Sequence, residues 1–386
     1  MYCDNYLIQL IMLSIITNFT LALSVIDVIT FFPNSFADVP LTLNDNVIDY
    51  NPDVDLPAED MIKRAGYPAE VHVITTDDGY LLSLHRIPGK PAYLLSDAGY
   101  DVWLGNIRGN TYSRAHINLS PQDSQFWNFS FHEMGIYDVP AAVSYIVEKT
   151  NMSLVYIGHS MGTTMGYVMA SERPEIAEKI KVMISLAPIG FMSHLKSPVR
   201  IVAPFANDIK TKLLERDGYY GETHNVTTED GFILNLHRIP GKLNSTPTLL
   251  NPILSNYPAG TSFKNLIHFS QDVEFNVFAK YDYGEEENVK IYNSSKPTDY
   301  DLSKVTSPTA LIYSEADWYS NPTDVEALFD LLPNIIDVHI VDHPKFTHMD
   351  FLWAIDAKSL VYDHVIDLVK KFSDQGLKND NNFSGN

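Results

Sequence analysis

The chain has 386 residues, of which 45% are hydrophobic, so it is long enough to form one large globular domain or two ordinary ones. Its formal net charge of −21 argues against nucleic acid or another polyanion as a partner, because no basic patch offsets the negative charge. The single cysteine, Cys3, argues against a fold held by disulfides, and a chain of this size can bury enough apolar surface without them.

The first feature along the chain is an apolar run at Leu7–Leu23, followed by the small-x-small pattern that ends at Ser24. Gln9 and Asn18 interrupt this run, which is already short for a membrane-spanning helix. We therefore predict a cleaved signal peptide over residues 1–24, no stable transmembrane anchor after cleavage, and an N-terminal extension over residues 25–60. This interpretation predicts a secreted or lysosomal protein.

Sequons for N-glycosylation support the secretory interpretation, because a signal peptide exposes them to the glycosylation machinery. The seven candidate sites are Asn118, Asn128, Asn151, Asn225, Asn244, Asn293 and Asn382.

The next segments predict a mostly parallel β-sheet covered by helices. Val71–Ile87 alternates apolar and polar residues around Asp78-Gly79, which is a hairpin signal. Nearly continuous apolar runs then predict strands buried on both faces, at Tyr100–Asn110, Ser153–Ser160, Ile180–Gly190, Thr309–Asp317 and Asp337–His343. Helical patterns lie between several of them, at Thr163–Lys179 and Asp356–Phe372. This alternation predicts the α/β class, with the functional groups at the carboxyl ends of the strands.

One segment occurs twice. Ile62–Lys90 and Leu214–Lys242 align at a constant offset with 17 identities in 29 positions, and both contain the hairpin pattern and the phrase "LHRIPGK". Two distant copies indicate duplication rather than a repeat array. We divide the rest of the chain into an N-terminal half of the core (61–206), the duplicated segment (207–251), a C-terminal half of the core (252–375) and a disordered tail (376–386).

The motif "GHSMG" at Gly158–Gly162 predicts a catalytic nucleophile. It follows a strand pattern and opens a helix pattern, as a nucleophile elbow requires, so Ser160 is the expected nucleophile. Gly158 and Gly162 leave room for the strand and the helix to approach each other. The backbone N–H of Met161, the residue after the nucleophile, is the expected oxyanion donor.

A serine hydroxyl needs a histidine base and a carboxylate that orients this base. In this fold they follow the nucleophile in the order acid, then histidine. Asp317 ends one predicted strand and His348 follows another, so we favour these two residues. Spacing alone leaves Glu315 and Asp324 open as the acid, and His343 open as the base.

Several segments resemble the acid lipase family of α/β-hydrolases, which includes gastric and lysosomal acid lipases. They are "LGNIRGNTYSRAH", "FWNFSFHEMGIYDVPA", "IGHSMGTT", "SLAPIGFM", "YPAGTS", "YDYG", "KPTDYDLSKV" and "HMDFLWAIDA". The resemblance implies Ser160 as nucleophile, Asp317 as acid and His348 as base. It also implies neutral lipid esters, such as triacylglycerols or cholesteryl esters, as substrates, an acyl-enzyme intermediate, and no metal or organic cofactor.

Two parts of the family pattern are missing. After the hairpin the family continues into a strand and a His-Gly-Leu loop that donates to the oxyanion, whereas here Lys90 runs directly into "PAYLLSDAGYDVW". The duplicated segment replaces much of the family's cap. A join between neighbouring duplicated genes would explain both. We therefore expect an incomplete sheet and impaired catalysis; the alternatives are a non-catalytic lipid-binding protein or a faulty gene prediction of an active lipase.

Overall fold

The computed structural model describes residues 9–14, 56–88, 94–195, 222–227, 233–238 and 260–380. The chain divides into two compact units, one formed by Met1–Thr17, Pro57–Lys196 and Ala259–Asn386, and the other by Asn18–Leu56 and Ser197–Pro258. The first unit contains the large sheet and every predicted catalytic residue. Most of the predicted N-terminal extension and of the reduced cap region lies outside the described residues.

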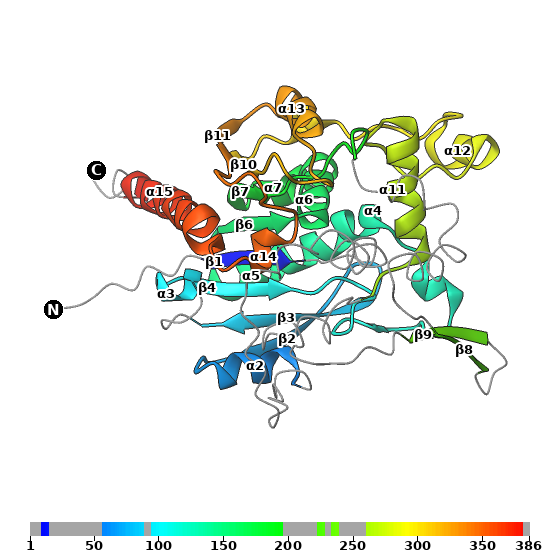
Figure 1. Cartoon of the computed structure of the whole chain (residues 1–386), viewed down its shortest axis with the longest axis horizontal. Coiled ribbons are helices and arrows are strands. Elements are labelled where there is room, and N and C mark those ends of the chain that lie inside the picture. Colours follow the sequence, from blue (N-terminus) through cyan, green and yellow to red (C-terminus); the bar gives the residue numbers. More distant parts are fainter. Residues whose placement is uncertain are drawn as a thin grey trace. The chain divides into compact units, whose positions relative to one another are not determined.

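The first unit is built on one nine-stranded sheet, in which the strand order is β11-β10-β7-β6-β1-β4-β3-β2 and β5 pairs with β3 (Figure 1). Strands β4, β1, β6, β7, β10 and β11 pair in parallel, whereas β2, β3 and β5 pair antiparallel. The strands are β1 Gln9–Ser14, β2 Glu70–Thr75, β3 Tyr80–Ile87, β4 Asp101–Gly105, β5 Ala115–His116, β6 Leu154–His159, β7 Ile180–Leu186, β10 Thr309–Tyr313 and β11 Ile335–Ile340. The predicted α/β class is confirmed.

Strand β1 lies between β4 and β6, at the position where the sequence predicted a missing strand. Its backbone pairs in parallel with β4, from Gln9 opposite Asp101, and with β6, up to Ser14 opposite His159. The expectation of an incomplete sheet was therefore wrong at this position, between β4 and β6. The physical reason is that six residues of the apolar N-terminal run satisfy the facing backbone groups of β4 and β6, which lie in the centre of the sheet and away from water.

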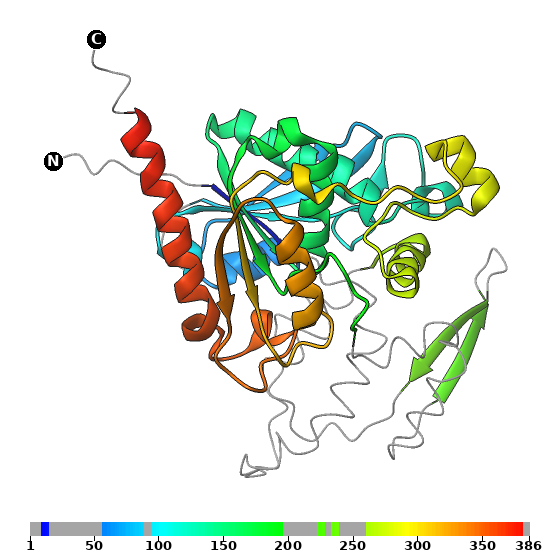
Figure 2. The same cartoon turned by 90° about the horizontal axis from the view of Figure 1, so that it is seen from above.

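Helices cover both faces of the sheet (Figure 2). The described helices are α2 Ala58–Arg64, α3 Leu94–Asp97, α4 Phe131–Glu133, α5 Val139–Thr150, α6 Met161–Glu172, α7 Pro174–Ala177, α11 Phe263–Phe275, α12 Glu285–Tyr292, α13 Pro322–Leu331, α14 Asp350–Trp353 and α15 Asp363–Asp380. Single 3₁₀ or π turns are η2 Ser124–Trp127, η3 Met134–Asp138, η5 Leu302–Lys304 and η6 Lys358–Tyr362.

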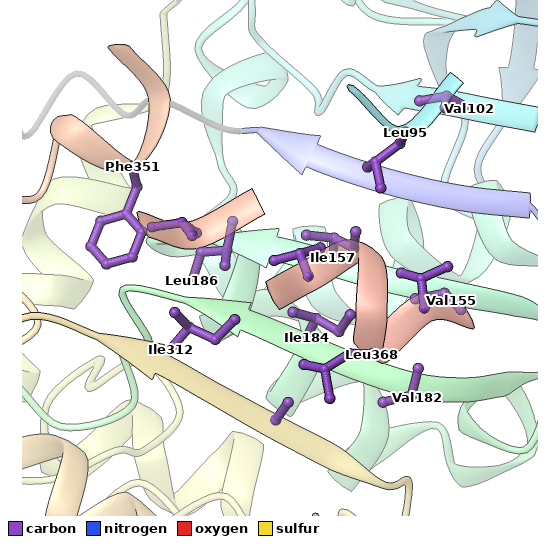
Figure 3. Close-up of a cluster of buried hydrophobic side chains, with 14 of the residues drawn as sticks. Leu95, Val102, Val155, Ile157, Val182, Ile184, Leu186, Ile312, Phe351 and Leu368 are labelled. Carbon is purple, nitrogen blue, oxygen red and sulfur yellow. The ribbon is translucent and has the colours of Figure 1, made fainter. Parts of the chain in front are cut away.

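The core under α15 shows why the parallel strands have nearly continuous apolar sequences. Val155 and Ile157 of β6 lie with Val182 of β7 and Leu368 of α15 in one buried cluster (Figure 3). Tyr156, the residue between the two, lies against Gly166 of α6, where an added Cβ would meet the tyrosine ring at 2.8 Å. Both faces of β6 are therefore buried, so the strand has no polar alternation.

The predicted helices form with changed boundaries. The pattern at Thr163–Lys179 becomes two helices, α6 and α7, because Pro174 lacks the N–H that a continuous helix needs. Helix α15 extends through residues 376–380, the first part of the predicted tail. Helix growth from a packed segment adds one hydrogen bond per residue, so it can run beyond the part buried at Val365 and Leu368. Residues 381–386 of the predicted tail lie outside the described part.

The described part of the second unit is the duplicated hairpin, with β8 at Glu222–Thr227 and β9 at Ile233–Arg238. These strands form a separate two-stranded antiparallel sheet. The hairpin predicted for Thr223–Ile239 is confirmed. Within the residues that the structure describes, no helix is long and apolar enough to cross a membrane.

Candidate active site

The segment predicted to be a nucleophile elbow is a turn at the carboxyl end of β6. Ser160 lies between β6 and α6 and has φ 56° and ψ −123°, a backbone conformation that is strained for a residue with a side chain. The turn is tight, since a Cβ on Gly158 would come within 2.7 Å of the Gly162 backbone. Gly158 is therefore needed for this close approach. Thr163 holds the turn from the helix side, because its backbone N–H and its hydroxyl both donate to the Ser160 carbonyl, at 2.8 and 2.6 Å.

The predicted base and acid meet the nucleophile in one relay. His348 Nε2 lies 2.7 Å from Ser160 Oγ, and His348 Nδ1 lies 2.8 Å from Asp317 Oδ2. Ser160, Asp317 and His348 are all buried, with exposed fractions of 7%, 0% and 3%. This arrangement can remove the serine proton during attack on an acyl carbon and return it to the leaving group.

Asp317 is held ionised by its surroundings. Burial raises the pKa of this carboxyl, but the neighbouring His348 and backbone hydrogen bonds outweigh burial, so the pKa lies below its usual range. The backbone N–H groups of Tyr319 and Ser320 donate to Asp317 Oδ1 at 2.8 and 2.9 Å. An ionised acid fixed by two donors can orient His348 and stabilise the imidazolium form of the base.

The alternatives left open by spacing take no part in this relay. Glu315 and His343 are exposed. Asp324 is buried but serves another segment, because it accepts hydrogen bonds from Ser193 Oγ at 3.1 Å and from the His194 backbone at 2.9 Å. The structure brings Asp317 and His348, rather than these neighbours, into one hydrogen-bonded chain with Ser160.

One residue at the site was missed by the sequence reasoning. His159 immediately precedes the nucleophile, and its Nε2 lies 3.0 Å from the backbone carbonyl oxygen of His348. The signal was present, since this histidine is the first variable position of the "GHSMG" motif. The motif assigns chemistry only to the serine and the glycines, so it gives the histidine no role.

The N–H of Met161 begins helix α6, where the first N–H groups have no acceptor within the helix and are available to an anion. The Met161 side chain is buried, and Asn265 Nδ2 lies 3.4 Å from its sulfur. This placement is compatible with the predicted oxyanion role. No cluster of three or more metal-ligating side chains occurs among the described residues.

Comparison with known proteins gives the same family. Residues 79–353 match the family described as alpha/beta hydrolase fold. The chain is 36% identical over 355 residues to Lipase 1 of Drosophila melanogaster, which covers 83% of this chain and 81% of the relative. It is 33% identical to gastric triacylglycerol lipase of Bos taurus and 31% identical to human lysosomal acid lipase/cholesteryl ester hydrolase, with 83% of this chain and 92% of each relative covered.

Proposed function

Because the chain is an α/β-hydrolase of the acid lipase family, and so a carboxylic ester hydrolase, we propose that it hydrolyses neutral lipid esters through an acyl-enzyme on Ser160. The observation that carries this proposal is the relay of 2.7 and 2.8 Å that joins Ser160, His348 and Asp317. The names of the gastric and lysosomal relatives support triacylglycerols or cholesteryl esters as the substrate class.

In the proposed reaction, Ser160 Oγ attacks the ester carbonyl while His348 Nε2 takes its proton. The base then gives this proton to the leaving alcohol, and a water molecule, deprotonated by the same histidine, releases the fatty acid. The N–H of Met161 stabilises the oxyanion. Loss of one oxyanion donor costs about 10²–10³ in rate, so the lack of a His-Gly-Leu sequence after Lys90 supports the proposal that turnover is weak.

The test uses purified protein with a triacylglycerol emulsion and a short-chain p-nitrophenyl ester. We expect Ser160→Ala to abolish hydrolysis, whereas Ser171→Ala, on the same helix and bonded to Val168 O at 3.1 Å, retains it. A fluorophosphonate should add its mass to the wild-type protein and not to Ser160→Ala. Equal hydrolysis by wild type and Ser160→Ala would contradict the proposal.

A second candidate is a lipid-binding protein without turnover, and the missing His-Gly-Leu sequence is the observation that favours it. The same assay separates the two. A chain that binds lipid vesicles but is not labelled by fluorophosphonate would be a non-catalytic member of the family. A labelled chain with turnover well below that of bovine gastric lipase would be an impaired enzyme.

We also propose a secretory location, supported by the lysosomal and gastric relatives. Four of the predicted glycosylation sites are exposed: Asn118, Asn128, Asn151 and Asn293. The others, Asn225, Asn244 and Asn382, have side chains outside the described part. Cleavage after Ser24 and strand β1 cannot coexist in one molecule, so the N-terminal peptide of the mature protein, read by mass spectrometry, decides between a removed leader and a retained strand.

A further inference from the structure

His159 is a buried histidine beside the relay for which the proposed reaction has no direct use. It ends β6, is covalently bonded to Ser160 and is only 3% exposed. Its ring centroid lies 4.9 Å from that of His348 and 6.0 Å from that of Phe351. The side chain therefore lies between the nucleophile's strand and the loop that carries the base.

The hydrogen bond of His159 fixes which of its nitrogens carries the proton. A carbonyl oxygen only accepts, so His159 Nε2 must donate to the His348 carbonyl across the 3.0 Å contact. Burial, followed by the charge that His348 can carry, lowers the pKa of His159 to about 3. The ring is therefore neutral above that pH, and Nδ1 is unprotonated, with no hydrogen-bond partner among the described side chains.

We propose that His159 is a positioning residue that ties the backbone of the catalytic base to the nucleophile; this inference rests on the proposed function. Asp317 orients the imidazole of His348 through Nδ1, but it does not hold the main chain from which this ring projects. His159 holds that main chain and is one peptide bond away from Ser160. The distance from Ser160 Oγ to His348 Nε2 is thus set by two contacts of the base, one to its ring from Asp317 and one to its main chain from His159.

The neutral state of the His159 ring matters as much as its hydrogen bond to the His348 carbonyl. When Ser160 gives up its proton, His348 becomes an imidazolium, and a positive charge 4.9 Å away between ring centroids would oppose this step. A neutral N–H donor holds the loop without that repulsion. A misplacement of about 1 Å between reacting groups can cost on the order of 100-fold in rate, so a tie of this kind can matter for catalysis.

Three variants test the proposal. His159→Leu keeps the volume and loses the donor, and His159→Gln restores an amide N–H in place of the ring Nε2. His339→Leu is a matched control. His339 lies on strand β11, and its Nε2 also contacts a backbone carbonyl, that of Leu360, at 3.2 Å. We expect His159→Leu to lower kcat for p-nitrophenyl ester hydrolysis about tenfold with KM unchanged, as loss of one buried hydrogen bond predicts.

His159→Gln should recover kcat to within about threefold of wild type, and His339→Leu should leave it unchanged. A proton NMR spectrum gives a readout independent of turnover, since the downfield proton shared by His348 Nδ1 and Asp317 should shift or broaden in His159→Leu only.

Wild-type kcat in His159→Leu would overturn the proposal. Equal losses in the Leu and Gln variants, with equal falls in Tm, would overturn it as well and assign His159 to packing. If fluorophosphonate fails to label even the wild type, the proposed function fails, and the NMR signal still decides the positioning role.

Discussion

The two copies of the duplicated hairpin have the same local structure and different surroundings. In the first copy Glu70 pairs with Arg86 and Ile74 with Leu82; in the second, Glu222 pairs with Arg238 and Val226 with Leu234. The register is identical at all six residue pairs of each hairpin. Yet β3 also pairs with β4 and β5 inside the nine-stranded sheet, whereas the structure describes β8 and β9 as a sheet of two strands. Local sequence specifies the hairpin, and only partners from elsewhere in the chain make it part of a core.

The test with the largest expected effect removes a backbone hydrogen bond between strands in each copy of the hairpin. Leu84 pairs with His72 on one side and Gly105 on the other. We expect Leu84→Pro to prevent folding of the first unit or to destabilise it by more than about 3 kcal/mol, because proline removes an N–H and distorts a central strand. Circular dichroism and thermal melting measure the effect.

The matched change, Leu236→Pro, affects a strand that pairs only with β8 among the described residues. We expect it to leave the main thermal transition and the fluorophosphonate labelling of Ser160 unchanged. A comparable loss of stability from both proline variants would show that the second copy supports the core as much as the first does.

Truncation of a core side chain should have the next largest effect. Leu82 is 1% exposed. We expect Leu82→Ala to lower the free energy of unfolding by about 2–5 kcal/mol, measured by urea denaturation, because it removes buried methyl groups and leaves a cavity. Leu234→Ala is the matched variant, and a smaller effect from it is expected. Equal effects in the two copies would contradict the comparison.

The third test removes a charged contact that the first copy makes with β4. Arg86 donates to Asp101 at 2.9 Å and to Glu70 at 3.0 Å, and Asp101 is fully buried. Asp101 lies on β4, outside the duplicated segment. Arg86→Ala should cost about 2–3 kcal/mol in unfolding free energy, since it leaves a buried carboxylate short of its main partner.

Arg238→Ala is the control for this ion pair, because among the described residues its hairpin has no third strand in the place of β4. We expect a change within about 0.5 kcal/mol of zero, as for substitutions that break no buried contact. A control variant as unstable as Arg86→Ala would mean that Arg238 has a strong partner of its own.

The smallest expected effect is a pH dependence. Burial opposes ionisation of Glu70, but hydrogen bonds from His72 and Arg86 lower its pKa below the usual 4.5. A depressed carboxyl pKa stabilises the fold above the unfolded-state pKa, and this stabilisation is lost as the pH falls through the folded-state pKa. We expect Glu70→Gln to reduce slightly the loss of Tm on acidification below about pH 4.5.

Glu222→Gln in the second copy provides the comparison for this titration. It should leave the acid limb of the Tm profile as in wild type. A steeper acid limb in Glu70→Gln than in wild type would reverse the sign and contradict the assignment of Glu70 as a stabilising carboxylate.

The sequence predicted most of the first unit because its strands and elbow carry local signals. Apolar runs marked β4, β6, β7, β10 and β11, and "GHSMG" marked the turn at Ser160. Asp317 and His348 were also favoured, but spacing could not separate them from neighbours a few residues away. Their selection needs the distances across strands, since 31 residues of chain separate the two partners of this hydrogen bond.

Strand β1 could not be predicted from the residues that form it. An apolar run at the start of a chain has the composition of a leader whether or not a sheet can accept it. Its role as a strand depends on the open backbone groups of β4 and β6, which belong to segments about 90 and 145 residues further along.

The sequence by itself determined the α/β class and the hairpin in both copies, and it predicted the strand-to-helix turn at Ser160, because hydrophobic period, turn residues and the elbow glycines act over short stretches of chain. Tertiary structure alone decided which copy joins the core, what fills the gap between β4 and β6, and how His159 meets the carbonyl of His348. These outcomes depend on hydrogen bonds and ion pairs between groups that are distant in sequence. No local sequence pattern specifies such pairs.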